Sequence, residues 1–346
     1  MVQLIDVDTF GYERVVHIAD SGTGLEGFIS IHSSKRGPAL GGLRFLPYVN
    51  HEEALADVLR LSETMTYKAA AAGLPFGGGK AVIIGDPQWD KTPELLAEFG
   101  RAVDMLNGHY ITAEDVGTSV EDIAVVAQAT RWVAGLPSNQ GGSDDPSPAT
   151  AEGVLFAMRA VARFFWGEET LRGCRVLVQG VGKVGGALTE MLLNAGAHVV
   201  IADVDTVRVE AVRRDTPSVE IADAESCLVI DCDILAPCAL GGILSQSVVP
   251  DLRCKAIVGS ANNQLRTHDV GAAIAEREIA YIPDFIANAG GIINIASEFG
   301  YTNSDVSLAL QRIGETADRL LRDCFTAKIS THQSAIALAQ RAIDGG

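Results

Sequence analysis

The feature that most constrains the fold is a short apolar segment that runs directly into a glycine-rich turn. Residues 175–179 read RVLVQ, and residues 180–185 continue as GVGKVG. A helical pattern over residues 184–194 and a second short apolar run, HVVIA at 198–202, follow at once. Strand, glycine-rich turn, helix and strand form the opening unit of a doubly wound parallel sheet. The sequence therefore predicts an α/β fold whose C-terminal part is a Rossmann-type doubly wound sheet.

The positions of the three glycines indicate a dinucleotide. Gly180 permits the tight turn, Gly182 lets the backbone approach a pyrophosphate, and Gly185 allows close packing of helix on strand. Lys183 and Val184 belong to the same turn and are further candidates for cofactor binding. The alternative is that these glycines only turn the chain.

An acidic residue at the end of the next strand bears on the choice of cofactor. Asp203 lies about twenty residues beyond the glycines, where a carboxylate can accept hydrogen bonds from ribose hydroxyls. The same charge would repel a 2′-phosphate, so we expect NAD rather than NADP. Alternatively, Asp203 is a solvated loop acid.

The length predicts two domains separated by a cleft, because 346 residues exceed the roughly 250 to 300 that one core serves. Short β-type runs at 27–32, 81–84 and 109–112 alternate with helical patterns. Residues 137–148, rich in Gly, Ser, Asp and Pro, have the composition of a hinge. Further runs at 231–236 and 255–259 continue the second sheet, and a helical pattern begins at about residue 304.

Charge and composition exclude several kinds of partner. A net charge of -17 without a basic cluster argues against nucleic acid and membrane surfaces. No N-terminal signal pattern occurs and no apolar run approaches the ~20 residues of a membrane span, so we expect a cytoplasmic protein. The six cysteines and seven histidines show no metal-binding spacing, so reduced thiols and no metal site are expected.

Lys68 is the first candidate for substrate binding. Asn50 and Glu53 resemble a capping box that starts a helix with an apolar face at Leu55, Val58, Leu59 and Met65. Lys68 follows three residues later near the same face, where an unpaired ammonium is costly. An anion such as a substrate carboxylate would compensate it. The alternative is a lysine whose stem packs at the helix end while its charge reaches solvent.

Lys80 is the candidate general base. It follows three consecutive glycines, 77–79, and precedes the strand pattern AVII at 81–84. A lysine in a dry cleft beside another cation loses proton affinity, which suits a base working near neutrality. The alternative is a strand-edge lysine after a flexible loop.

The motifs around these lysines resemble the glutamate/leucine/phenylalanine/valine dehydrogenase family, most closely its leucine dehydrogenases, over nearly the whole chain. They are GPALGG at 37–42, MTYKA at 65–69, GGGK at 77–80, ITAEDVG at 111–117, DPSP at 145–148, APCALGG at 236–242, GSANN at 259–263 and NAGG at 288–291. The resemblance implies an NAD-dependent enzyme that oxidatively deaminates an L-amino acid to a 2-oxo acid, ammonia and NADH.

The resemblance also implies roles for individual residues. Lys68 would bind the substrate carboxylate, Lys80 would activate water, and Asp115 would exchange protons with the amino group. By itself Asp115 would be interpreted as a turn acid. The remaining implied positions are Gly41 and Gly42 as donors to the carboxylate, Asn262 near nicotinamide and substrate, and Thr150 and Ala239 at the cofactor.

Two positions argue against glutamate as the substrate. Glutamate-specific members of the family place a lysine and a serine where this chain has Leu40 and Ile295, which would leave a side-chain carboxylate buried and unpaired. The expected apolar pocket comprises Leu40, Met65, Ala113, Ile292 and Ile295, although any of these could be ordinary core. We favour leucine, valine or isoleucine, while the small Ala113 leaves phenylalanine or tryptophan open.

The expected domains are residues 1–140 for substrate binding and oligomerisation, 141–325 for NAD, and a helix at 326–346 returning to the first domain. We expect a homo-oligomer. No basic tail follows the last helix, which argues against the octamer of leucine dehydrogenases but leaves dimer, tetramer and octamer open. An NAD-binding sensor without catalysis is disfavoured by the intact set Lys68, Lys80 and Asp115. A hydroxy-acid dehydrogenase would need a histidine that no matching motif supplies.

Overall fold

The structure, a computed structural model, describes residues 1–345 and forms two compact units. The first unit contains Met1–Asp145, Ile295–Gly300 and the residues from Ala339 on. The second contains Pro146–Asn294 and Tyr301–Leu338. No helix among the described residues is long and apolar enough to cross a membrane.

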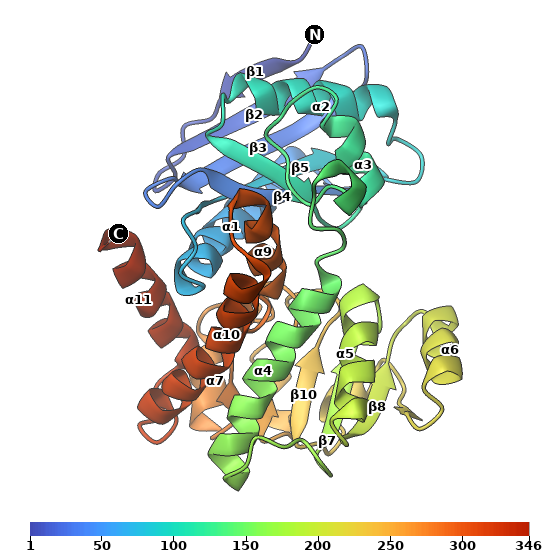
Figure 1. Cartoon of the computed structure of the whole chain (residues 1–346), viewed down its shortest axis with the longest axis vertical. Helices are drawn as coiled ribbons and strands as arrows, with labels where there is room; N and C mark the ends of the chain where they lie inside the picture. Colours follow the sequence, from blue (N-terminus) through green and yellow to red (C-terminus); the bar gives the residue numbers. More distant parts are fainter. Residues whose placement is uncertain (346) are drawn as a thin grey trace. The chain divides into compact units, whose positions relative to one another are not determined.

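The first unit is built on a six-stranded mixed sheet of order β1-β2-β3-β5-β4-β6 (Figure 1). Its strands are β1 (Gln3–Asp6), β2 (Arg14–Asp20), β3 (Leu25–Ser33), β4 (Ala39–Leu46), β5 (Gly77–Ile84) and β6 (Tyr110–Glu114). β1, β2, β3 and β5 pair antiparallel in turn, whereas β4 runs parallel to both β5 and β6. The parallel half therefore carries GPALGG, GGGK and ITAED side by side.

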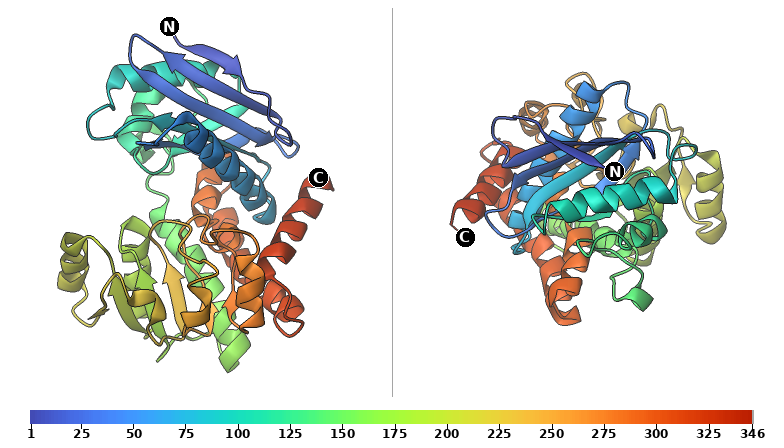
Figure 2. Two further views of the ribbon diagram at one scale, coloured as in Figure 1. Left: turned by 180° about the vertical axis from the view of Figure 1, so that it is seen from behind. Right: turned by 90° about the horizontal axis from the view of Figure 1, so that it is seen from above.

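Helices cover both faces of this sheet (Figures 1 and 2). α1 (His51–Ala71) covers one face, where its residue Val58 packs against Phe28 and Val82 of the sheet. α2 (Pro93–Met105), with α3 (Val120–Val126) beside it, covers the core on the other face. As predicted, α1 begins after Asn50, whose side chain accepts a hydrogen bond from the Glu53 amide at 2.8 Å.

The three glycines before Lys80 belong to a strand, whereas the sequence analysis placed the strand from residue 81 and considered a flexible loop as the alternative for the glycines. β5 begins at Gly77, so Lys80 is its fourth residue and lies in its interior. A Cβ at Gly77 would lie 2.0 Å from the Ser33 carbonyl oxygen, and one at Gly78 would lie 2.1 Å from the Thr66 amide of α1. The glycines thus let β5 pack directly against neighbouring backbone.

The second unit is built on an entirely parallel sheet of order β12-β11-β10-β7-β8-β9. Its strands are β7 (Arg175–Gln179), β8 (His198–Ala202), β9 (Glu220–Ile221), β10 (Ile234–Pro237), β11 (Ala256–Ile257) and β12 (Ala280–Tyr281). This is the doubly wound order with its switch point between β7 and β10. The predicted runs 231–236 and 255–259 form the shorter strands β10 and β11.

The helices that follow α3 are α4 (Ser147–Trp166), α5 (Lys183–Asn194), α6 (Thr206–Asp215), α7 (Val270–Glu276), α8 (Asp284–Ala287), α9 (Gly290–Ile295), α10 (Asn303–Cys324) and α11 (Thr331–Asp344). Short 3₁₀ turns occur at Ser138–Gln140, Cys227–Val229, Val249–Asp251 and Ala296–Phe299. The helical pattern expected from residue 304 is therefore two helices, α10 and α11. α11 begins in the second unit and ends in the first.

Candidate active site

The first unit contains a buried ionic cluster centred on Asp115. The Lys80 ammonium lies 3.0 Å from Asp115 Oδ2, and Arg44 Nε donates to the same oxygen at 2.9 Å. The side chains of Lys80, Arg44 and Asp115 are 5%, 13% and 14% exposed. Two cations therefore share one carboxylate oxygen in a site that largely excludes water.

Strand alternation explains why these side chains meet. Leu43, Ala81 and Tyr110 contribute to the core under α2. Successive strand residues point to opposite faces, so Arg44 and Lys80 point to the α1 face. Asp115 follows β6 directly, level with Arg44 because Glu114 pairs with Leu43. Three adjacent strands thus each supply one charged group.

A second carboxylate, Asp57 of α1, holds the other end of Arg44. Arg44 Nη1 donates to Asp57 Oδ2 at 2.9 Å, and the Tyr48 hydroxyl donates to the same oxygen at 2.8 Å. Arg60, which is half-exposed, binds Asp57 Oδ1 at 3.0 Å. Arg44, Asp57 and Tyr48 were missed in the sequence analysis. The available signal was an arginine inside the otherwise apolar strand ALGGLRFL.

The charges in this cluster set its protonation. Burial lowers the pKa of the Lys80 ammonium, the Arg44 charge acts in the same direction, and Asp115 only partly opposes them. For Asp115, burial alone would raise the pKa, but the charges and hydrogen bonds of Lys80 and Arg44 hold it well below its usual range. Burial likewise disfavours charge on Arg44, yet Asp115 and Asp57 raise its pKa. Lys80 is therefore the member of the cluster that can give up a proton.

Gly41 and Gly42 lie beside this cluster on β4. A Cβ at Gly41 would lie 1.8 Å from the Gly79 carbonyl oxygen and 3.4 Å from Met65 Cγ. A Cβ at Gly42 would lie 2.3 Å from the Glu114 carbonyl oxygen and 2.9 Å from Asp115 Cβ. Both glycines are thus required by close packing, and they bring the β4 backbone next to Met65 and Asp115.

The other expected substrate residues are mostly buried. Lys68 lies in the last turn of α1 and is 8% exposed. Leu40, Ala113, Ile292 and Ile295 are all buried, and Met65 is half-buried. Lys68, Leu40, Met65, Ala113 and Ile295 belong to the first unit, whereas Ile292 belongs to the second.

The three glycines of the glycine-rich turn in the second unit have different surroundings. Gly180 has a φ of 94°, and a Cβ there would lie 2.6 Å from the Ala239 amide. A Cβ at Gly185 would lie 1.9 Å from the Gly180 carbonyl oxygen, so only glycine lets α5 approach β7. At Gly182 the nearest atom would be Arg208 Nη1 at 3.8 Å, so packing within the chain does not require glycine there. This opening lies at the N-terminus of α5, where no side chain caps the helix. A bound anion suits it.

Asp203 is tied to this turn. Its Oδ2 accepts a hydrogen bond from the Val181 amide at 2.8 Å, and its Oδ1 accepts one from the Asp205 amide at 2.9 Å. The carboxylate is therefore held beside the glycine turn with lone pairs left for further donors. Lys183 and Val184 form the first turn of α5.

Two further groups of expected residues come together in the second unit. Asn288 Nδ2 donates to Asn262 Oδ1 at 2.9 Å and to the Ser260 carbonyl oxygen at 3.0 Å, which orients Asn262. The Thr150 hydroxyl donates to the Pro146 carbonyl oxygen at 2.9 Å. A Cβ at Gly291 would lie 2.9 Å from the Thr150 hydroxyl oxygen, so Gly291 packs closely beside it. Ala239 contacts the glycine turn at Gly180.

The doubly wound sheet and glycine turn of the second unit, together with the buried lysine–aspartate pair of the first unit, define a two-unit α/β enzyme with a dinucleotide-binding type of fold. Comparison with known families makes the class specific. Residues 13–132 match the model described as "Glu/Leu/Phe/Val dehydrogenase, dimerisation domain", and residues 141–210 and 202–343 match "Glutamate/Leucine/Phenylalanine/Valine dehydrogenase". The chain belongs to this family of amino acid dehydrogenases.

Several relatives cover most of the chain. A valine dehydrogenase of Streptomyces virginiae is 52% identical, with 85% of this chain and 83% of the relative covered. A phenylalanine dehydrogenase of Thermoactinomyces intermedius is 47% identical (84% and 80% covered), and a leucine dehydrogenase of Geobacillus stearothermophilus is 42% identical (98% and 92%). The crystal structure of L-tryptophan dehydrogenase from Nostoc punctiforme superposes with a TM-score of 0.79 at 36% identity (97% and 96% covered).

Proposed function

We propose that this chain catalyses the reversible, NAD-dependent oxidative deamination of an apolar L-amino acid. The observation that carries the proposal is the buried Lys80 ammonium, whose pKa is lowered and which shares Asp115 with Arg44. A group of this kind can act as a general base at neutral to alkaline pH.

Each charged residue has a distinct part in the proposed reaction. Lys68 binds the substrate carboxylate, and Asp115, held as an anion, orients the substrate ammonium. Asp115 takes up a proton from the amino group only when Lys80 is neutral, because the Lys80 charge otherwise holds the pKa of Asp115 down. NAD+, held at the glycine turn of the second unit, would supply the oxidant that takes hydride from Cα. Neutral Lys80 then removes a proton from water as its oxygen adds to the iminium carbon. Asp115 returns its proton to the amino nitrogen, and ammonia leaves as the hydroxyl proton passes to solvent and the 2-oxo acid forms.

NAD fits the second unit on two observations. The space in front of Gly182, at the N-terminus of α5 where no side chain caps the helix, suits the pyrophosphate. Asp203, fixed by Val181, suits the ribose hydroxyls and would repel a 2′-phosphate. The cofactor-binding residues we propose are Gly180, Gly182, Lys183, Val184, Gly185, Asp203, Thr150, Ala239 and Asn262.

The substrate proposed is branched-chain, that is leucine, valine or isoleucine. Leu40 and Ile295 are apolar and buried, so neither can pair with a side-chain carboxylate. An aromatic substrate is the second candidate, favoured by the small Ala113 and by the phenylalanine and tryptophan dehydrogenases among the relatives. One methylene changes binding by only about 1 to 3 kcal/mol, so pocket volume decides between them.

The deciding experiment measures NADH formation at alkaline pH with leucine, valine, isoleucine, phenylalanine, tryptophan and glutamate, each with NAD+ and with NADP+. We expect the highest kcat/KM with a branched-chain substrate and NAD+, and none with glutamate. Preference for an aromatic substrate would select the second candidate. No NADH or NADPH with any of them would refute the proposed function.

We also infer a homo-oligomer, with the first domain carrying the subunit contacts. The family model matching residues 13–132 is described as a dimerisation domain. Light scattering of the purified chain tests this inference, and a monomer at micromolar concentration would contradict it.

A further inference from the structure

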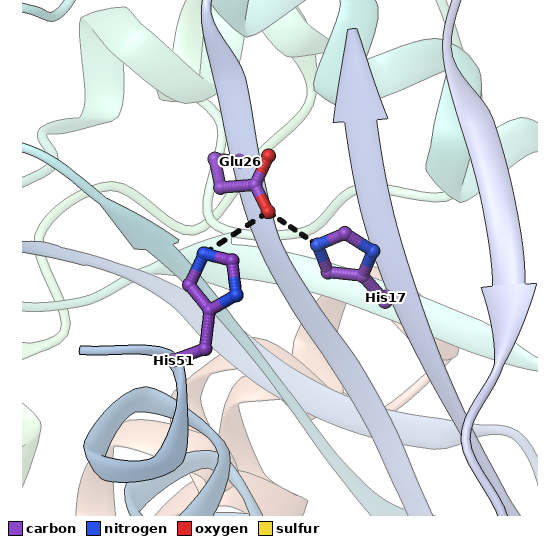
Figure 3. A group of neighbouring side chains, drawn as sticks. All are labelled: His17, Glu26 and His51. Atoms are coloured by element: carbon purple, nitrogen blue, oxygen red, sulfur yellow. Dashed lines mark hydrogen bonds and ion pairs between the residues drawn. The ribbon is translucent and has the colours of Figure 1, made fainter.

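Two histidines and a glutamate meet on the α1 side of the first sheet, away from the charged cluster around Asp115. His17 lies on β2, Glu26 on β3, and His51 is the first residue of α1. β2 and β3 pair antiparallel with His17 opposite Phe28, so Glu26, two residues from Phe28, is the diagonal neighbour of His17 on the same face. Figure 3 shows both imidazole rings turning a nitrogen toward the carboxylate.

The three potential ligand atoms are close together. Glu26 Oε1 is in hydrogen-bond contact with His17 Nε2 and lies 3.2 Å from His51 Nε2. All three atoms lie within 4.8 Å of one another. In a tetrahedral zinc site with bonds of about 2.0 to 2.1 Å, the ligand atoms lie about 3.3 Å apart. Rotation of the His51 ring, which is 60% exposed, can supply the remaining adjustment.

The aromatic surroundings hold the rings near this arrangement. The His17 ring centroid lies 5.1 Å from that of buried Phe28 and 5.7 Å from that of His51. The His51 ring also packs edge-on against Phe28 at 6.1 Å. Both imidazoles therefore pack against the ring of Phe28, which limits their rotation in the absence of an ion.

We propose that His17, Glu26 and His51 bind a divalent first-row transition metal ion of the zinc class. Imidazole nitrogen and carboxylate oxygen are ligands that this class accepts, and a water can complete four-coordination on the exposed side. The ion would join β2, β3 and the N-terminus of α1. The sequence analysis expected no metal site, because His17 and Glu26 are nine positions apart and only strand pairing brings them together.

Metal titration of the whole purified chain, stripped with a chelator and dialysed, tests this proposal. Co2+ is added with its visible absorption recorded, and Zn2+ is added with its stoichiometry measured by elemental analysis after gel filtration. We expect one ion per chain and a Co2+ spectrum without the intense thiolate bands that the cysteines would give. Saturating Zn2+ should raise the Tm of the transition that includes the first unit by about 5 °C or more.

Variants locate the ion. His51→Ala removes the most exposed ligand, and Glu26→Gln keeps the shape of the side chain while removing its charge. Each should weaken Zn2+ binding at least tenfold and abolish the rise in Tm. The matched control is His268→Gln, which breaks the other close histidine pair, His268 Nδ1 to His332 Nε2 at 2.8 Å, and should bind Zn2+ as the unaltered chain does.

Three results would overturn the proposal. The unaltered chain could fail to bind Zn2+ or Co2+ stoichiometrically at any micromolar concentration. Binding could survive both His51→Ala and Glu26→Gln, or it could disappear in His268→Gln. These measurements do not involve turnover, so they stand independently of the proposed dehydrogenase activity.

Discussion

Replacing Arg44 should move the pH dependence of catalysis. Arg44 Nε and Lys80 Nζ share Asp115 Oδ2 at 2.9 and 3.0 Å, so these two cationic groups lie within roughly 6 Å of each other. At an effective dielectric constant of about 20 their repulsion is about 3 kcal/mol, and it disfavours the charged form of Lys80. Arg44→Met removes this repulsion, and water entering the space that the guanidinium leaves screens part of the attraction of Asp115. We therefore expect a net rise in the pKa of Lys80.

The direction of the effect on rate follows from the role of Lys80. Lys80 acts as a base only when it is neutral. A higher pKa therefore leaves a smaller fraction of Lys80 neutral at any pH below that pKa. The acid limb of the kcat/KM profile, which reports the free enzyme, should therefore move up by about one pH unit. At a fixed pH on that limb, kcat/KM should fall about tenfold. Steady-state rates with a branched-chain substrate over a pH series measure this shift.

Two further variants distinguish the effect of the Arg44 charge from an effect of structural damage. Arg60→Met makes the same substitution in a residue that binds Asp57 at 3.0 Å and is 52% exposed, so its acid limb should stay within a few tenths of a pH unit. Arg44→Lys retains a positive charge and should keep the limb close to its original position. Circular dichroism shows whether Arg44→Met is folded. If the folded variant has an unchanged acid limb, this account of Lys80 is refuted.

The remaining predictions concern the base and the cofactor. Lys80→Ala should lower turnover at least about a hundredfold while NAD+ binding, followed by fluorescence, persists; unchanged turnover would remove Lys80 from the mechanism. Asp203→Ser should raise the ratio of kcat/KM with NADP+ to that with NAD+ about tenfold or more, and an unchanged ratio would show the assignment to be wrong. Gly182→Ala should weaken NAD+ binding without lowering Tm, whereas Gly185→Ala should lower Tm because its Cβ would lie 1.9 Å from the Gly180 oxygen. Equal loss of Tm in both glycine variants would contradict the distinction.

Local signals were enough to predict the centre of the second unit. β7 and β8 have the predicted bounds, and α5 begins one residue earlier than expected. Here apolar runs, turn glycines and a following helix agree with one another over a short stretch of chain. β4 was not among the predicted strands, since two glycines in its interior, Gly41 and Gly42, are not typical of a strand. They are strand residues because neighbouring backbone approaches too closely for a side chain.

The candidate site was predictable only in part. Lys80 and Asp115 stand in family motifs, so each could be singled out from the sequence. Their contact with Arg44 could not, because Arg44 and Asp115 are 71 positions apart and meet through the order of β5, β4 and β6. The meeting of His17, Glu26 and His51 depends in the same way on the pairing of β2 with β3.

The first unit is discontinuous in sequence, and this has a consequence for biosynthesis. The Glu298 carboxylate accepts hydrogen bonds from the Gly135 and Ser143 amides at 2.8 and 2.9 Å, and Arg36 donates to the Ala342 carbonyl oxygen at 2.6 Å. A nascent chain on the ribosome cannot make these contacts until the residues of the second unit have been translated. The unit whose translation starts first is therefore the last to acquire all of its native contacts.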